Sequence, residues 1–288
     1  LGTEPTLGLR FLNMKFTAIA LTVCFAFTSV AEAYIPHSRT IIGRLARNQG
    51  KGAYAIEQEI EFKQGTETTK VRERWIVDDA AAMRLSVSGP GAKFVGVYRA
   101  KNRVVPDLKG GWSNGVPGAE FVEPFAYARS TSEILRLLNH SGIVPGSFSR
   151  ERPQFNPNSK TPYTPEPLVR LGRVEGVVTY VFGTPSPADQ SKPGAWIEQD
   201  SFLLRKLRFP SNAEVVASHF GSFDSGLKLP KERKITWGDR TATIHVISVK
   251  SIPSAQAQKL LSSTTLTPND AREAQLPEIA KEFYSRFR

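Results

Sequence analysis

The segment from Tyr54 to Phe62 constrains the fold of this chain more than any other feature. Apolar or amide side chains occupy every second position, and the positions between them carry Ala55 and three glutamates. A period of two residues is the signature of a β-strand with one buried and one solvated face. The sequence therefore predicts a strand that has one wet, acidic face.

Further segments with the same alternation follow, and short turns separate them. The expected strands span residues 54–62, 71–77, 83–87, 94–98, 168–171, 174–182, 195–199, 202–209, 214–220, 228–237 and 241–252. Short links between alternating strands favour an antiparallel meander. We predict an α+β fold that is mainly β, with about eleven strands.

Helices are expected before, between and after the two groups of strands. Ser38 is predicted to cap a short helix that ends near Asn48. Ser130 and Glu133 have the spacing of a capping box at the start of a second helix. Further helical segments are expected at residues 254–262 and 277–287 of a helical C-terminal tail, residues 253–288.

The alternation lapses between Val104 and Pro167. A glycine-rich stretch at residues 109–118 predicts a loop around Trp112. Prolines then crowd residues 145–167, where neither a helix nor a central strand can form because proline lacks a backbone donor. We interpret this second stretch as a proline-rich arm.

The chain also carries the features of a secretory signal peptide. Met14 and Lys15 lead into an uncharged apolar run, Phe16 to Thr28, which Ala31-Glu32-Ala33 closes. The run is too short to cross a bilayer, where about 20 residues are needed. We expect cleavage after Ala33 and a periplasmic location, and we interpret residues 1–13 as an upstream extension.

Cys24 is the only cysteine, and it lies within this apolar run. A lipid-modified Cys24 is the alternative, because the preceding Leu21-Thr22-Val23 has lipobox-like spacing. Val23 is bulky where a small residue is expected, so we predict soluble export. The mature chain then has no cysteine, which excludes disulfides, thiolate catalysis and iron–sulfur ligation.

The formal net charge of +11 belongs to the mature part, because the charges of residues 1–33 cancel. Such a surface favours anionic partners such as lipid headgroups, acidic glycans or acidic proteins. The export signal argues against nucleic acid. The candidate residues for an anionic-partner surface are Arg205, Lys206, Arg208, Lys228, Lys231, Arg233 and Lys234.

No catalytic or metal-binding motif stands out. The four histidines, His37, His140, His219 and His245, are scattered without metal-ligand spacing. Asp224-Ser225-Gly226 matches the loop of aspartic proteases, but that chemistry needs a second copy and the sequence has none. We therefore expect a tight turn there, no catalytic residue, no metal and no cofactor.

Two segments of the chain echo one another. Trp75 to Asp79, followed by Met83-Arg84-Leu85, is matched by Trp196 to Asp200, followed by Leu204 to Leu207. Each predicts a hairpin with an aromatic strand, an acidic turn and a second strand that mixes apolar and basic residues. Similar hairpins arise either from two halves built alike or from the general character of one sheet.

The order of these elements resembles the LolA/LolB-like family of bacterial periplasmic proteins, which includes lipoprotein carriers. The resemblance rests on the signal peptide, the two helices, Glu73 to Leu85, Trp196 to Phe202, and the final strands after Gly226. It covers most of Tyr34 to Ile252. It implies a half-barrel domain at residues 34–252, an incomplete antiparallel barrel with helices covering its open concave side and acyl chains in an apolar cavity.

Large apolar residues on the predicted strands are the candidates for lining that cavity. They are Tyr54, Ile56, Ile60, Phe62, Trp75, Met83, Leu85, Phe94, Val178, Tyr180, Phe182, Trp196 and Phe202. Each residue alone is better explained as ordinary core than as a ligand contact, since sheets bury aromatic side chains. Only the whole set facing one cavity would indicate a binding function.

Three hypotheses follow. The main prediction is a non-catalytic, exported carrier or sensor that binds lipid or lipoprotein acyl chains and makes transient contact with anionic membranes or envelope proteins. The second is an envelope interaction protein that binds an anionic glycan or protein through its basic surface and carries no lipid. The third is an exported hydrolase whose site is assembled from dispersed residues.

Overall fold

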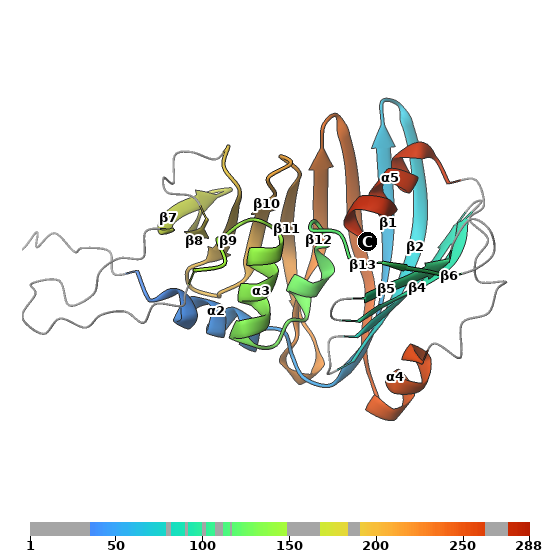
Figure 1. Ribbon diagram of the computed structural model, residues 1–288, viewed down its shortest axis with the longest axis horizontal. Helices are drawn as coiled ribbons and strands as arrows, with labels where there is room; N and C mark the ends of the chain where they lie inside the picture. The colour runs from blue at the N-terminus through green and yellow to red at the C-terminus, as the bar shows by residue number, and fades with distance from the viewer. Residues whose placement is uncertain are drawn as a thin grey trace, which may run out of the picture. The chain divides into compact units, whose positions relative to one another are not determined.

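A single antiparallel sheet dominates the computed structural model, which describes residues 35–78, 82–89, 92–99, 102–106, 112–115, 117–148, 168–183, 191–262 and 276–288 (Figure 1). The strands are β1 Ala53–Gln64, β2 Glu67–Val77, β3 Met83–Gly89, β4 Ala92–Arg99, β5 Asn102–Pro106, β6 Trp112–Gly115, β7 Val169–Val174, β8 Val177–Phe182, β9 Gly194–Glu198, β10 Leu204–Arg208, β11 Glu214–Ser222, β12 Lys228–Trp237 and β13 Arg240–Ile252.

The sheet has 13 strands in the order β6-β5-β4-β3-β2-β1-β13-β12-β11-β10-β9-β8-β7. Neighbours in space are neighbours in sequence except at the centre, where β1 pairs with β13. Strands β6 and β7 form free edges, so the sheet is not closed within the described residues. In Figure 1, β1 and β2 stand upright whereas β4 to β6 run obliquely across them, so the sheet is strongly curved. This confirms the predicted incomplete barrel.

Two strands of the sheet were not among the predicted strands, and the second of them lies where the sequence predicted a loop. β5 pairs with β4 through Val97 and Val104, and β6 pairs with β5 through Ser113 and Val105. The prediction of a loop at residues 109–118 is therefore wrong for Trp112–Gly115. An edge strand such as β6 pairs on one side only, and its backbone hydrogen bonds require no two-residue alternation of side chains.

The predicted alternation of buried and exposed residues in β1 is confirmed. The structure also shows which residues of the neighbouring strand lie opposite its glutamates. Glu57, Glu59 and Glu61 lie opposite Arg74, Arg72 and Lys70 of β2. The Nζ atom of Lys70 is 2.9 Å from Glu59 and 3.4 Å from Glu61. The basic side chains of β2 thus neutralise the negative charges on the predicted acidic face of β1.

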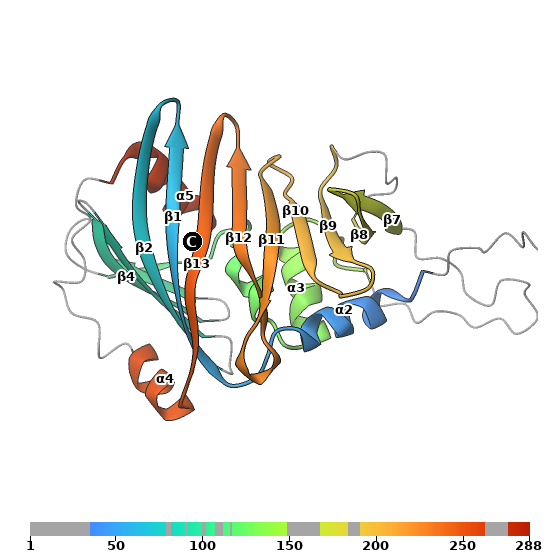
Figure 2. The ribbon, with the colours of Figure 1, turned by 180° about the vertical axis from the view of Figure 1, so that it is seen from behind.

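Helices cover the concave face. They are α2 Ser38–Arg47, α3 Thr131–His140 and α5 Glu278–Phe287, together with the 3-10 turn η1 Glu123–Ala126. Helices α3 and α5 lie in front of the sheet in Figure 1 and behind it in Figure 2, so both cover the same side. The apolar side chains of α2 and α3 are buried in the main core.

The N-terminal ends of α2 and α3 can be compared with the predicted capping residues. Ser130 Oγ accepts from the backbone N–H of Glu133 at 3.2 Å, and the Glu133 carboxylate accepts from the Ser130 N–H, which confirms the capping box. The cap of α2 is His37, whose Nδ1 accepts from the backbone N–H of Arg39. Ser38 is therefore not the cap; it is the first helical residue and is fully buried.

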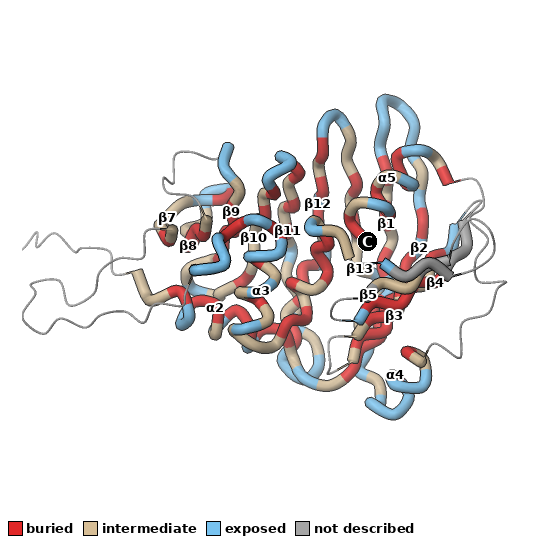
Figure 3. Tube along the Cα trace, in the orientation of Figure 1, coloured by how far each residue is buried: buried red, intermediate tan, exposed pale blue. Residues whose placement is uncertain are grey.

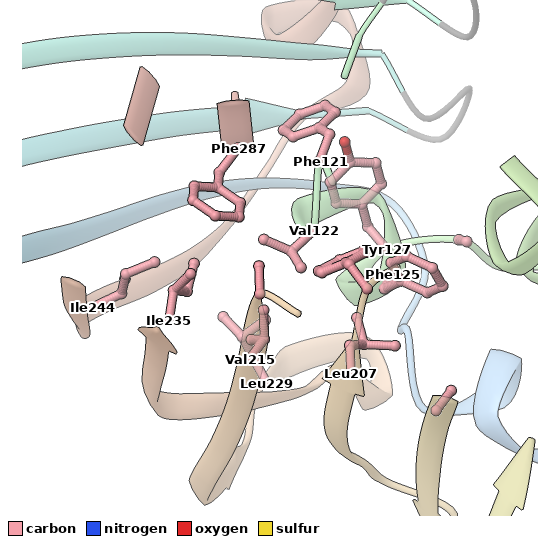
Figure 4. Close-up of a cluster of buried hydrophobic side chains, with 14 of the residues drawn as sticks. Phe121, Val122, Phe125, Tyr127, Leu207, Val215, Leu229, Ile235, Ile244 and Phe287 are labelled. Carbon is pink, nitrogen blue, oxygen red and sulfur yellow. The ribbon is translucent and has the colours of Figure 1, made fainter. Parts of the chain in front are cut away.

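The core lies between the helices and the sheet. In Figure 3, buried and less buried positions alternate along the strands, as a sheet with one covered face requires. Figure 4 shows that side chains of the η1 segment and α5 face side chains that rise from the strands. The labelled residues are Phe121, Val122, Phe125, Tyr127 and Phe287 on one side and Leu207, Val215, Leu229, Ile235 and Ile244 on the other.

Helix α4, Ser254–Leu261, packs in a separate small cluster. Its Ala257 and Leu261 are buried against Ala53, Ala55 and Ile76. Arg84 and Arg99 donate to the carbonyl oxygens of Leu260 and Leu261, each at 2.8 Å, so both arginines cap the C-terminal end of this helix. Among the described residues, no helix is long and apolar enough to cross a membrane.

Candidate functional site

Most of the predicted cavity residues meet in the main core. Tyr54, Ile56, Ile60, Phe62, Trp75, Met83, Leu85, Tyr180 and Phe182 are buried there, and the half-buried Phe202 packs against them. Val178 is half-buried, and the side chain of Phe94 lies outside the described residues. Trp196 belongs to a separate cluster with Val174 and Val181. The structure thus brings most of the set together, without Trp196.

The space above these residues is filled by helix α5. The ring centroids of Phe62 and Phe283 are 5.1 Å apart, and those of Trp237 and Phe287 are 5.2 Å apart. Phe283 and Phe287 are both fully buried. Over β1, β12 and β13 the concave face is therefore closed by side chains of the protein itself.

A cluster of charged residues lies within this filled region. Arg288 donates from Nε to Glu73 at 3.2 Å and from Nη1 to Glu123 at 2.5 Å. Arg233 donates to Glu123 at 3.0 Å and also to the side-chain oxygen of Gln58. All five side chains are buried. Two carboxylates face two guanidinium groups, so the cluster is neutral as a whole and ties α5 and η1 to the sheet.

Burial and ion pairing shift the pKa values of these charged groups in opposite directions. Burial raises the pKa of the Glu123 carboxyl, although Arg288 and Arg233 pull it back. Burial also lowers the pKa of Arg233. For Arg288 burial acts downward, but the two carboxylates outweigh it and raise its pKa. Because every charge has an opposite partner, this cluster serves to hold the fold together.

Sequence reasoning missed this cluster, although the sequence contains a signal for it. Gln58 takes an inward position in the alternation of β1, and Glu73 and Arg233 do the same in β2 and β12. Polar residues at positions that the pattern reserves for apolar ones are rarely buried without partners. Three such positions on three strands therefore predict a shared polar contact.

An open apolar pocket lies elsewhere, between β4 and α3. Its volume is about 420 Å³, and it is partly open to solvent. Its lining comes from β4, the segment that leads into η1, and one side of α3: Tyr98, Arg99, Pro117, Gly118, Phe121, Pro124, Tyr127, Ala128, Glu133, Arg136, Leu137, Asn139, His140 and Ser141. None of the predicted cavity residues lines it.

Aromatic rings form the inner part of this pocket. The centroids of Tyr98 and Phe121 are 4.8 Å apart, and Trp75 lies behind both at 6.2 Å and 6.4 Å. Burial raises the pKa of Tyr98 to about 12, so its hydroxyl stays protonated. The pocket therefore borders the predicted core residues without being lined by them.

The predicted basic surface is largely neutralised. Arg205 is 2.6 Å from Glu198, and Lys206 and Arg208 both pair with Glu214, at 2.8 Å and 2.5 Å. Such pairs lower the charge that a polyanion would meet.

One member of that predicted surface is not at the surface at all. Arg233 points into the core and binds Glu123, because its position in β12 has the inward direction of Ile235 and Trp237. Lys231 and Lys234 are exposed, and Lys228 is half-buried. The structure thus leaves two exposed lysines from the predicted set.

Two smaller predictions concern chemistry. Asp224–Gly226 forms the 3-10 turn η2, in which Ser225 has a left-handed φ of 57°, and this confirms the predicted tight turn. Among the described residues, no group of three histidine, cysteine, aspartate or glutamate side chains is placed to hold a metal ion.

The open, curved antiparallel sheet with helices over its concave face is similar to the fold of a solved LolA-like structure. A LolA superfamily protein from Nitrosomonas europaea is similar over 81% of this chain and 100% of its own length, with a TM-score of 0.50 and 10% identity. At this identity the likeness establishes the fold, and the predicted resemblance is confirmed at that level.

Two further solved structures are similar. A DUF1329 family protein from Desulfovibrio piger covers 81% of this chain and 100% of its own, with a TM-score of 0.49 and 10% identity. A putative outer membrane lipoprotein-sorting protein domain from Vibrio parahaemolyticus covers 76% of this chain and 94% of its own, with a TM-score of 0.45 and 10% identity. No family model and no curated protein sequence matches the chain.

Proposed function

We propose that this protein is a non-catalytic carrier or sensor that binds the acyl chains of lipids or lipoproteins. The observation that carries the proposal is the pocket of about 420 Å³ between β4 and α3. Its size falls within the roughly 300 to 1,000 Å³ of ordinary small-molecule sites. The binding site is therefore moved from the strand residues that the sequence favoured to the pocket beside them.

The lining suits an acyl chain. Phe121, Tyr98, Tyr127 and Leu137 offer apolar surface, and the pocket opens toward solvent, where a headgroup can remain. Each methylene transferred from water contributes about 0.8 kcal/mol, so ten of them supply about 8 kcal/mol before the cost of association. Binding of this kind requires no catalytic group.

Export belongs to the same proposal. A carrier or sensor of lipoproteins works outside the cytoplasm, and the predicted signal peptide with cleavage after Ala33 would bring it there. N-terminal sequencing of the secreted protein is expected to begin at Tyr34. A lipid-modified N-terminus at Cys24 would overturn this part.

The direct test is native mass spectrometry of the protein purified from its own periplasm, followed by lipid extraction. We expect additional masses that match acyl lipids. The proposal fails if the purified protein carries no lipid and also does not bind a fluorescent fatty acid added to it.

A pocket-filling variant locates the site. Leu137 lines the pocket, so Leu137→Trp is expected to weaken binding of a fluorescent fatty acid by at least about tenfold through steric exclusion. Arg47→Trp is the control, because it adds the same indole to an exposed position of α2 that is not part of the pocket lining. Equal affinities for the two variants would place acyl binding elsewhere.

A further inference from the structure

We infer that the pocket between β4 and α3 takes a ligand with one acyl chain and an anionic headgroup. The inference rests on the proposed function and adds the chemical class of the ligand. It has two parts, the number of chains and the sign of the headgroup charge, and each part has its own support in the pocket.

The volume supports a single chain. A pocket of about 420 Å³ lies near the lower end of the roughly 300 to 1,000 Å³ of ordinary small-molecule sites, which favours a ligand with one chain over a larger one. Two chains would need about twice the space, and the neighbouring hollow over β1 and β13 is already filled by Phe283 and Phe287 of α5.

The charges around the pocket support an anionic headgroup. Two arginines line it, Arg99 from β4 and Arg136 from α3. Arg136 is exposed, and none of the ion pairs between described residues includes it. Arg99 donates one N–H to the Leu261 carbonyl, which leaves other guanidinium donors of this side chain available.

One carboxylate, that of Glu133, also lines the pocket, but it is engaged. It accepts from the backbone N–H groups of Arg129 and Ser130 at the start of α3, where its charge is favoured by the helix dipole. The opposite end of α3, at His140 and Ser141, carries the negative end of that dipole. An anionic headgroup is therefore expected at Arg136, in the middle of the helix.

Four ligands whose hydrocarbon chains have the same number of carbons test the inference in a competition assay against a fluorescent fatty acid. They are palmitate, palmitoyl lysophosphatidate, hexadecanol and dipalmitoyl phosphatidylglycerol. We expect the first two to bind about tenfold more tightly than the neutral hexadecanol, since a charge-assisted contact has about this effect. The two-chain lipid is expected to bind most weakly. Comparison of palmitate with lysophosphatidate distinguishes a carboxylate from a phosphate headgroup.

The decisive variant is Arg136→Gln. It is expected to weaken palmitate binding by about tenfold and to leave hexadecanol unchanged, because only the charged headgroup loses a partner. Arg47→Gln, at an exposed helical arginine of α2, is the matched control and is expected to change neither affinity. Thermal denaturation of both variants verifies that the fold is intact.

The outcomes separate this inference from the proposed function. Equal binding of palmitate and hexadecanol, or an equal effect of Arg136→Gln on both, overturns the anionic headgroup and leaves acyl binding in place. Phosphatidylglycerol that binds as tightly as palmitate overturns the single chain. If none of the four ligands competes, the proposed function itself fails.

Discussion

The first strand of each of the hairpins β2–β3 and β9–β10 contains the pair Trp-Ile, but the two hairpins bury this pair in opposite directions. In β2, Trp75 is part of the main core and Ile76 packs under helix α4 in the separate cluster. In β9, Ile197 is part of the main core and Trp196 lies in its own cluster with Val181. The two similar segments therefore both form hairpins, but the two hairpins turn opposite faces toward the main core.

The difference follows from what covers each residue. Trp75 donates to Glu73 at 3.0 Å and lies under the Arg288 guanidinium, 5.3 Å from its ring centroid. Trp196 lies under Lys206, whose ammonium is 5.2 Å from the indole and 2.8 Å from Glu214. A buried tryptophan thus marks the core in one hairpin and a small apolar patch under a lysine in the other.

The largest effect is expected from replacing the two tryptophans. Trp75→Ala should destabilise the fold by about 4 to 5 kcal/mol, because it opens a cavity and removes the N–H donor to Glu73. Trp196→Ala should cost about half as much, since the Lys206 side chain can move into the space. Urea denaturation of both variants measures the difference, and equal losses would contradict the contrast between the two faces.

The next largest effect concerns the charges above Trp75. Arg288→Met should destabilise the protein by about 3 kcal/mol, because it leaves Glu73 and Glu123 buried without one partner. Arg286→Met, which removes a partly exposed arginine of the same helix, should cost less than about 1 kcal/mol. Similar losses in urea denaturation would mean that Arg288 is held no more tightly than a surface arginine.

A smaller loss of stability is expected where helix α4 packs over Ile76. Leu261→Ala should destabilise the fold by about 2 kcal/mol, since Leu261 is buried in the cluster with Ala53 and Ile76. Leu260→Ala is the control, because Leu260 is only partly buried there and should cost about half as much. If the two variants unfold at the same denaturant concentration, α4 does not bury Ile76 in solution.

The smallest effect is a pH dependence beside Trp196. Burial acts to raise the pKa of the Glu214 carboxyl, but Lys206 and Arg208 outweigh it and hold the pKa below its usual 4.5. This carboxylate therefore contributes stability that is present above pH 4.5 and is lost as pH falls through the lowered pKa.

Glu214→Gln should remove that dependence, with a loss of at most about 1 kcal/mol at neutral pH because the pair is partly solvated. Urea denaturation over a series of pH values compares the variant with the parent. An unchanged difference between them at every pH would show that Glu214 makes no pH-dependent contribution.

The candidate site could be predicted only in part. The strands that carry Ile56, Phe62 and Leu85 follow from alternation, and so does the direction of these side chains. The pocket could not be predicted, because it lies where α3 and the segment around Phe121 meet β4, and no local pattern relates these three pieces. That Phe283 fills the hollow over β1 could not be predicted either. The pattern of a short amphipathic helix shows which of its sides is apolar, but not which surface of the protein that side covers.

The sequence by itself determined the antiparallel strands and the capping box at Ser130, because periodicity and capping are local properties of a chain. The half-barrel class was implied by the resemblance of the order of elements to the LolA/LolB-like family. Only the tertiary structure decided which face of each hairpin is covered, that Arg233 is buried, and where open space remains. These outcomes depend on packing between segments distant in sequence, and packing responds to total volume and charge pairing that no single segment contains.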